Sequence, residues 1–215
     1  MAAAERKCVI VSASPDCDPS FIERSVCCGD FIVCADGGLD TLAKTSLKPD
    51  LIVGDFDSAA NENIFPDVET ITLKVRKIDT DTMHCVDVCL ERGFSEFLLL
   101  GATGGRTDHA LANLSILLYL QKKGAHGVIS DKYNDIMLLH PGENKISAIS
   151  GTTVSVLPFG ESSACLSYTG MSYPLDHGTV TVDYPYTISN IAVEDEVTVT
   201  LHSGSALLFV VHGNE

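Results

Sequence analysis

The chain contains no tryptophan, and no lysine or arginine follows Lys145. Its 14 Lys and Arg residues against 29 Asp and Glu residues give a formal net charge of −15. Because nucleic-acid binding depends on basic side chains that neutralise phosphates, this balance argues against a nucleic-acid partner. The sequence also lacks an apolar run near the roughly 20 residues that span a bilayer, and its N-terminal run is too short for a signal-peptide core. We therefore expect a cytoplasmic protein without a membrane partner.

The absence of basic residues after Lys145 has two interpretations, since seven acidic residues lie in the same segment. A solvated acidic surface is the commoner origin of such charges. The sharper alternative is that this segment faces a cationic ligand or a metal-loaded site.

Cysteine is frequent, but its spacing is not that of a metal or redox motif. The eight cysteines include no Cys-x-x-Cys pair. Cys85 and Cys89 fit one helix face, yet no His or Cys pair completes a zinc set. Most cysteines lie in apolar runs, so we expect buried free thiols.

Residues 7–140 alternate short β-like runs with helix-like stretches, which is typical of a parallel sheet covered on both faces. The expected strands are 8–12, 31–35, 51–53, 69–73, 97–101, 127–130 and 136–139, and the expected helices are 37–45, 80–92 and 107–123. Thr107 or Asp108 could cap the last helix, and Gly124 would close it.

From about residue 146 the composition changes to Thr, Ser, Val and Tyr with frequent turn signals. Thr179-Val-Thr-Val and Val197-Thr-Val-Thr-Leu alternate with a period of two, which predicts half-buried antiparallel strands. We expect a boundary near 141–147. The predicted organisation is a Rossmann-like α/β domain over residues 1–142 and an all-β sandwich or roll over residues 143–215.

Carboxylates follow several of the expected strands. Leu51-Ile-Val-Gly is followed at once by Asp55 and Asp57, and two carboxylates so close repel unless a cation lies between them. Asp36 ends another apolar run and precedes Gly37-Gly38, where backbone N–H groups can approach a phosphate. Asp81 lies near a helix start. Capping or turn formation is the commoner role of any one of them, but together they predict Mg²⁺ and a phosphate substrate.

A second candidate site is Gly101-Ala-Thr-Gly-Gly-Arg-Thr-Asp-His109. Small residues between a strand and a long helix let the helix N-terminus face an anion, and Arg106 adds a planar guanidinium that suits phosphate oxygens. The segment matches neither a Walker loop nor a dinucleotide fingerprint. His109 has either a packing role or the role of a catalytic base, and Ser189-Asn190 alone is a commonplace turn.

Together these segments resemble the thiamine pyrophosphokinase family. The resemblance rests on Ala35-Asp-Gly-Gly38, Pro49-Asp-Leu-Ile-Val-Gly-Asp-Phe-Asp-Ser58, Asp79-Thr-Asp-Thr82, Gly101-Ala-Thr-Gly-Gly-Arg-Thr-Asp-His-Ala-Leu-Ala-Asn113 and Ser189-Asn190. It implies transfer of pyrophosphate from ATP to the hydroxyl of thiamine, which gives thiamine diphosphate and AMP. It also implies a homodimer in which thiamine is held where the two subunits meet.

The resemblance further implies roles for individual residues. It implies that Asp55, Asp57 and Asp81 bind the Mg²⁺ ion. It implies that ATP is bound by Asp36, Gly37, Thr103 and Arg106, with Asn134 a weaker candidate on the adenine side. His109, Ser189 and Asn190 would contact thiamine, and Asp57, Asp81, Arg106 and Asp108 would form the catalytic set. The chain lacks the Trp that the family's animal members have near thiamine, so a Tyr or Phe would replace it. The Arg76-Lys-Ile spacing before Asp79 also differs from the family's commoner pattern.

Two other functions remain open at this level. The same chemistry on a hydroxymethyl-pterin would suit a C-terminal region without basic residues less well, because a pterin is not a fixed cation. A nucleotide sensor without turnover is a rival of another class, although simple anion binding gains nothing from an acidic cluster. Of the three functions, a structural role explains the carboxylates at the strand ends least well.

Overall fold

The structure, a computed structural model, describes residues 6–54, 64–73 and 80–212. The chain forms two compact units, Met1–Lys132 and Tyr133–Glu215. This division comes before the expected boundary at residue 142. The reason is that β7 (Asn134–Leu138) pairs antiparallel with β14 (Ala206–Val211), so the chain joins its second unit earlier than its composition changes.

The first unit contains a parallel sheet in the order β6-β5-β1-β2-β3-β4. Its strands are β1 (Cys8–Val11), β2 (Phe31–Ala35), β3 (Leu51–Gly54), β4 (Glu69–Thr72), β5 (Glu96–Leu100) and β6 (His126–Ser130). Every residue of β1 and β3 is buried. Strands covered on both faces require such continuous apolar runs, which is why they could be recognised from the sequence.

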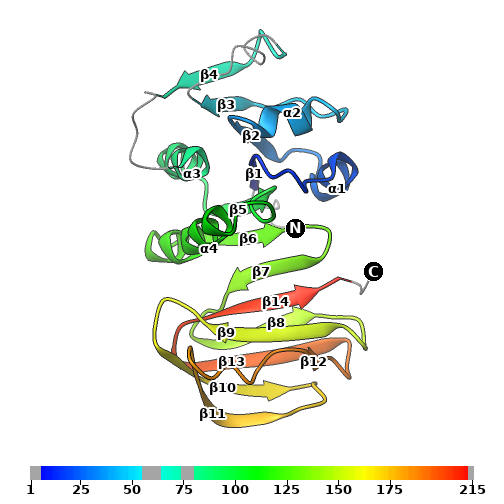
Figure 1. Cartoon of the computed structure of the whole chain (residues 1–215), viewed down its shortest axis with the longest axis vertical. Helices are drawn as coiled ribbons and strands as arrows, with labels where there is room; N and C mark the ends of the chain where they lie inside the picture. Colours follow the sequence, from blue (N-terminus) through cyan, green and yellow to red (C-terminus); the bar gives the residue numbers. More distant parts are fainter. Residues whose placement is uncertain (1–5, 55–63, 74–79, 213–215) are drawn as a thin grey trace. The chain divides into compact units, whose positions relative to one another are not determined.

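Helices cover both faces of this sheet (Figure 1). α1 (Pro19–Ser25) contacts α2 (Gly38–Leu42), and α3 (Asp81–Glu91) contacts α4 (Thr107–Lys122). The sequence prediction missed α1, a helix with one buried residue, Ile22, and therefore no apolar period. The described helices include none that is long and apolar enough to cross a membrane.

The two helices that matter most for the site begin differently. Thr80 caps α3, and its side chain accepts a hydrogen bond from Met83 N at 3.3 Å. The cap position of α4 is Arg106, which makes no side-chain capping bond. The expectation that Thr107 or Asp108 caps α4 is therefore wrong. Both lie within the first turn, and the Asp108 carboxylate is engaged by Arg106 instead.

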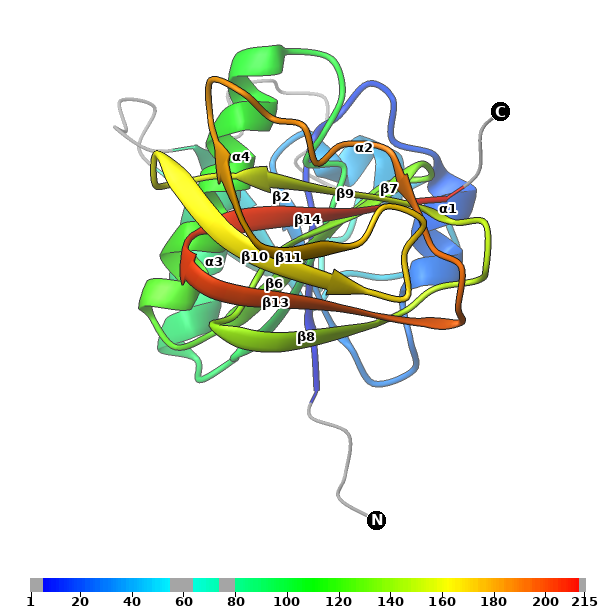
Figure 2. The ribbon, with the colours of Figure 1, turned by 90° about the horizontal axis from the view of Figure 1, so that it is seen from below.

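The second unit is built from antiparallel strands in two sheets, β12-β9-β14-β7 and β11-β10-β13-β8 (Figure 2). The additional strands are β8 (Gly142–Ser147), β9 (Thr153–Pro158), β10 (Ser163–Thr169), β11 (Leu175–Thr181), β12 (Asn190–Ile191) and β13 (Glu196–Gly204). Alternate residues of β9 and β10 are buried. They form one core with residues of the other sheet, as in Val154 with Leu166 and Val199. The α/β character of the first unit and the β-rich character of the second agree with the sequence prediction.

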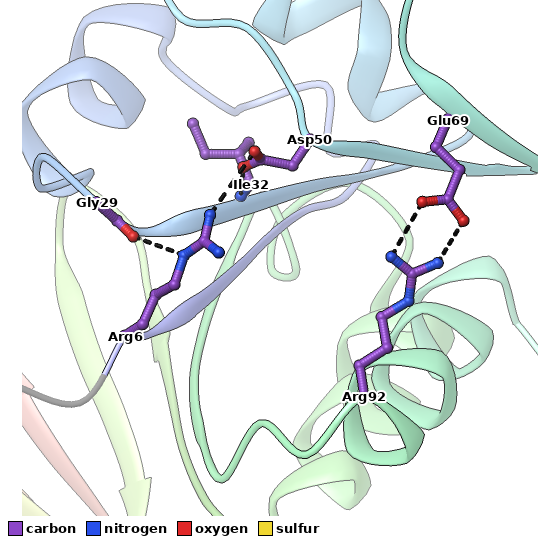
Figure 3. Close-up of polar contacts among 6 residues, drawn as sticks. All are labelled: Arg6, Gly29, Ile32, Asp50, Glu69 and Arg92. Carbon is purple, nitrogen blue, oxygen red and sulfur yellow. Dashed lines mark hydrogen bonds and ion pairs between the residues drawn. The ribbon is translucent and has the colours of Figure 1, made fainter.

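Hydrogen bonds and ion pairs connect residues at the amino ends of the parallel strands, opposite their carboxyl ends (Figure 3). Arg6 Nε donates to Gly29 O at 2.8 Å, and Asp50 Oδ2 accepts from Ile32 N at 2.9 Å. Arg92 donates from both terminal nitrogens to the Glu69 carboxylate, at 3.2 and 2.5 Å. Because these groups are partly exposed, we expect them to position the strands more than to stabilise the fold.

Candidate active site

A cavity of about 690 Å³ opens in the first unit at the carboxyl ends of β1, β2 and β5. Its volume is within the range of small-molecule sites, and its position is where open α/β sheets bind ligands. The lining residues are Ser12, Ala13, Ser14, Pro15, Ala35, Asp36, Gly37, Thr80, Asp81, Thr82, Gly101, Ala102, Gly104, Gly105, Arg106, His109 and Asn113. Five of the predicted site residues therefore share one cavity: Asp36, Gly37, Asp81, Arg106 and His109.

Asp36 lies directly after β2 in a left-handed backbone conformation (φ 33°) that non-glycine residues adopt rarely. Its backbone N donates to Val53 O at 2.9 Å, and a Cβ at Gly54 would lie only 3.0 Å from Asp36 Oδ1. The end of β3 therefore passes directly beside this carboxylate. The predicted ligands Asp55 and Asp57 follow Gly54 and lie outside the described residues.

Asp81 is the first residue of α3 and reaches the cavity from another element. The neighbouring Thr82 is buried, and its Oγ1 is 2.9 Å from Ser12 Oγ at the end of β1. This hydroxyl pair fixes the start of α3 against the sheet. Among the described residues, Asp36 and Asp81 are the carboxylates that line the cavity, and no group of three or more His, Cys, Asp or Glu is arranged for a metal.

Arg106 lines the cavity from the start of α4 and forms a two-point ion pair with Asp108. Its Nε and Nη2 donate to the two carboxylate oxygens at 3.1 and 2.6 Å. The guanidinium lowers the pKa of Asp108 to about 2. Both side chains are about two-thirds exposed. The pair is therefore screened by water, and Arg106 can exchange Asp108 for a phosphate at little cost.

The loop between β5 and α4 is held by the loop after β1. Asp16 Oδ2 accepts from Gly105 N at 3.0 Å. Gly104 has φ 90°, and a Cβ there would lie 2.6 Å from Asp16 Oδ2 and 2.8 Å from Ser14 Oγ. A Cβ there would displace the Asp16 and Ser14 side chains, and the positive φ itself favours glycine. The sequence prediction did not include Ser12, Ser14 or Asp16, although the small residues of Ser12-Ala-Ser-Pro after the first strand were a usable signal.

Thr103 and Asn134 are not among the residues lining this cavity. Thr103 Oγ1 donates to Asp131 Oδ2 at 2.6 Å. Asn134 belongs to β7 in the second unit, where it pairs with Val211. Their proposed contacts with the nucleotide remain predictions. Asn113, a buried residue of α4 without a predicted role, donates to Ala102 O at 2.7 Å and so ties α4 to the loop.

Ser189 and Asn190 lie in the second unit. Asn190 is buried, and its amide holds the backbone of Tyr173 by accepting from N at 3.0 Å and donating to O at 2.8 Å. Ser189 is exposed with φ 56°, and its N donates to Ser155 Oγ at 2.9 Å. These bonds hold the backbone of Tyr173, and the residue itself is 70% exposed.

The thiols offer no nucleophile to the cavity. All eight cysteines are free. Burial raises the pKa of Cys34 to about 12 and that of Cys17 to about 11. The expectation of buried free thiols holds for Cys8, Cys34, Cys85 and Cys89, whereas Cys27 and Cys28 are exposed.

Comparisons with known proteins match both parts of the chain. Residues 24–129 match the family model of the thiamin pyrophosphokinase catalytic domain, and residues 143–206 match that of the thiamin pyrophosphokinase vitamin B1 binding domain. The thiamine pyrophosphokinase of Bacillus subtilis (strain 168) is 29% identical over 180 residues, covering 80% of this chain and 83% of that protein. Thiamine pyrophosphokinase 3 of Oryza sativa subsp. japonica is 28% identical over 207 residues, covering 83% and 77%. The crystal structure of the Bacillus subtilis enzyme superposes with a TM-score of 0.87 at 26% identity, covering 97% of this chain and 100% of that one.

Proposed function

The chain belongs to the thiamine pyrophosphokinase family, and from this membership we propose how its residues carry out pyrophosphate transfer from ATP to thiamine. The products are thiamine diphosphate and AMP, since ATP gives up its β- and γ-phosphates. One observation carries the assignment: Asp36, Asp81 and Arg106 reach a single cavity from the ends of three different elements. Acidic and basic groups together suit a metal-loaded polyphosphate better than a free anion.

The triphosphate of ATP binds in the cavity of the first unit. The 16-residue helix α4 directs its N-terminal end there, and such ends attract anions. Arg106 turns from Asp108 to the phosphate oxygens, where its planar fork can bind two of them. Asp16 holds Gly105 and so keeps the loop in place while the nucleotide enters.

The donor set fits Mg²⁺, which prefers one or two carboxylates together with phosphate oxygens and water. Asp36 and Asp81 would hold the ion with Asp55 and Asp57. When bound, the ion neutralises the charge that builds on the phosphate oxygens during transfer. A chain with a net charge of −15 has few other means of offsetting a polyphosphate.

The acceptor binds to Ser189, Asn190 and His109. Thiamine carries a permanent thiazolium cation, which suits a region without Lys or Arg after Lys145. Tyr173 is our candidate for the aromatic residue that stands in for the missing Trp, because Asn190 fixes its backbone and leaves its ring exposed. The hydroxyl of thiamine attacks the β-phosphorus, its proton passes to a carboxylate of the cavity, and AMP leaves. We further propose a cytoplasmic homodimer in which both subunits contribute to the thiamine site.

An AMP-release assay tests this function. We expect AMP to form only when ATP, Mg²⁺ and thiamine are all present, and EDTA in excess of Mg²⁺ to stop the reaction. Equal AMP release without thiamine, or with a hydroxymethyl-pterin in its place, would refute the acceptor assignment. Binding of ATP without any AMP would favour the sensor function instead.

A further inference from the structure

Three hydroxyl side chains in the wall of the cavity are almost completely buried. Ser12, Ser14 and Thr82 are 3%, 8% and 7% exposed, and all three line the cavity. They belong to the first unit, as does the rest of the lining. Because burial removes a hydroxyl from water, it needs hydrogen-bond partners within the protein or on a ligand.

These hydroxyls carry more O–H donors than the protein satisfies. Ser12 Oγ and Thr82 Oγ1 are 2.9 Å apart, and one of them donates to the other. Each hydroxyl has one proton, so this bond leaves the proton of the accepting hydroxyl. Ser14 Oγ accepts from Asp16 N at 3.2 Å, which uses a lone pair and leaves its own O–H. Among the residues that the structure describes, neither remaining O–H has an acceptor.

The order of the strands places these donors between the two charged parts of the cavity. Ser12 and Ser14 follow β1, which lies between β2 and β5 in the sheet. Asp36 follows β2, and the loop that ends at Arg106 follows β5. Because the carboxyl ends of parallel strands meet at one edge, the neutral donors lie between the Asp36 carboxylate and the Arg106 guanidinium.

We propose that Ser14 and the Ser12–Thr82 pair donate hydrogen bonds to the polyphosphate of ATP, at oxygens between those that Arg106 and the metal bind. This assignment rests on the proposed function. Ionised phosphate oxygens are strong acceptors, so they match two O–H donors that have no acceptor in the protein. A hydrogen bond from a hydroxyl to an ionised oxygen is also stronger than one between neutral groups. Since hydroxyls are neutral, they can bind these oxygens without pairing with the nearby carboxylates as a cation would.

Calorimetric titration of the full chain with the α,β-methylene analogue of ATP, in the presence of Mg²⁺, tests the proposal. The methylene group replaces the oxygen whose bond breaks during transfer, so this ligand binds without reacting. We expect its Kd to rise about tenfold or more in Ser14→Ala, because each lost hydrogen bond is to a charged group. The same rise is expected in the double variant Ser12→Ala/Thr82→Val, which is used because either hydroxyl of the pair can be the donor.

Ser130→Ala is the matched control. Ser130 ends β6 in the same unit, is 8% exposed like Ser14, and is not among the residues that line the cavity. We expect this variant to bind the analogue like the parent chain. A Kd that rises equally in Ser130→Ala would show a general loss of packing and would overturn the proposal. An unchanged Kd in Ser14→Ala or in the double variant would overturn it for the hydroxyl concerned.

Steady-state kinetics separate binding of the polyphosphate from a structural role. In Ser14→Ala we expect the KM for ATP to rise and the KM for thiamine to stay at the parent value, whereas a disturbed fold would change both. The proposed function fails separately. If thiamine gives no AMP but the Kd of the analogue depends on the hydroxyls, the acceptor assignment is wrong and this proposal stands. If AMP release depends on thiamine but the variants bind the analogue normally, the reverse holds.

Discussion

Arg106 lowers the pKa of Asp108, and this contact gives a direct test at the residue scale. The pKa of Asp108 is about 2, below the ordinary 3.8, chiefly because of the hydrogen bonds from Arg106. A lowered pKa in the folded state stabilises the protein above about pH 4, and this contribution is lost as the pH falls toward 2. In Arg106→Gln we expect the pKa to return toward 3.8, measured by carboxyl-carbon NMR with Asp108→Asn for assignment. Arg24→Gln is the control. If the pKa of Asp108 stays near 2 in Arg106→Gln, the first turn of α4, and not Arg106, lowers it.

The buried hydroxyl pair of Ser12 and Thr82 should behave as a coupled unit. Ser12→Ala or Thr82→Val alone leaves one buried hydroxyl without its partner, which we expect to lower the free energy of unfolding by about 1–3 kcal/mol. The double variant should lose clearly less than the sum of the two, because neither polar group then remains. Urea unfolding of the four proteins measures this coupling. Strictly additive losses would show that the bond does not join β1 to α3.

Tyr173 and Tyr184 are a matched pair for testing the thiamine site, with 70% and 71% of their surfaces exposed. Only Tyr173 has its backbone held by Asn190. A tyrosine ring over a thiazolium cation contributes about 1 kcal/mol or more. We therefore expect Tyr173→Ala to raise the KM for thiamine roughly fivefold to tenfold with the KM for ATP unchanged. Tyr184→Ala should leave both values unchanged, and equal effects in the two variants would remove Tyr173 from the pocket.

Between elements, the contact of the β1–α1 loop with the β5–α4 loop can be tested with two glycines of nearly equal φ. Gly104 (φ 90°) lies against Asp16, whereas Gly93 (φ 87°) has open space around it. Alanine at either position incurs the left-handed backbone cost of about 1–2 kcal/mol. Only Gly104→Ala also displaces Asp16 from Gly105, so we expect its kcat to fall about tenfold or more. Similar kcat values in Gly104→Ala and Gly93→Ala would mean that this contact does not position the site.

Four of the strands that the sequence predicted correctly share a strong physical signal. β1, β2, β3 and β5 are buried on both faces, so each required an uninterrupted apolar run. α1 left no such signal, because a short helix can be specified by Asp18 as its cap and Pro19 at its first position. The cap of α4 was misassigned for a related reason. Local rules favour Thr107 or Asp108, but an ion pair with Arg106 competes for the carboxylate.

Part of the cavity lining was predictable from the sequence. Asp36 follows a strand directly, and Arg106 ends the glycine-rich loop between a strand and a helix, and the carboxyl ends of parallel strands meet at one edge. Ser12 and Asp16 were not found, because their roles depend on contacts with residues 70 to 89 positions away.

For the whole molecule, the proposed dimer makes activity depend on concentration. Tyr173 and Ile188 each expose more than half of their surface beside the predicted thiamine residues, since Tyr173 is hydrogen-bonded to Asn190 and Ile188 precedes Ser189. We expect sedimentation equilibrium to give twice the chain mass of 23.0 kDa. Because thiamine would bind between subunits, specific activity should fall on dilution through the dimer dissociation constant, and saturating thiamine should oppose that loss by mass action. A chain that sediments as a 23.0 kDa monomer with full activity would contain its thiamine site within one subunit, which contradicts the shared site.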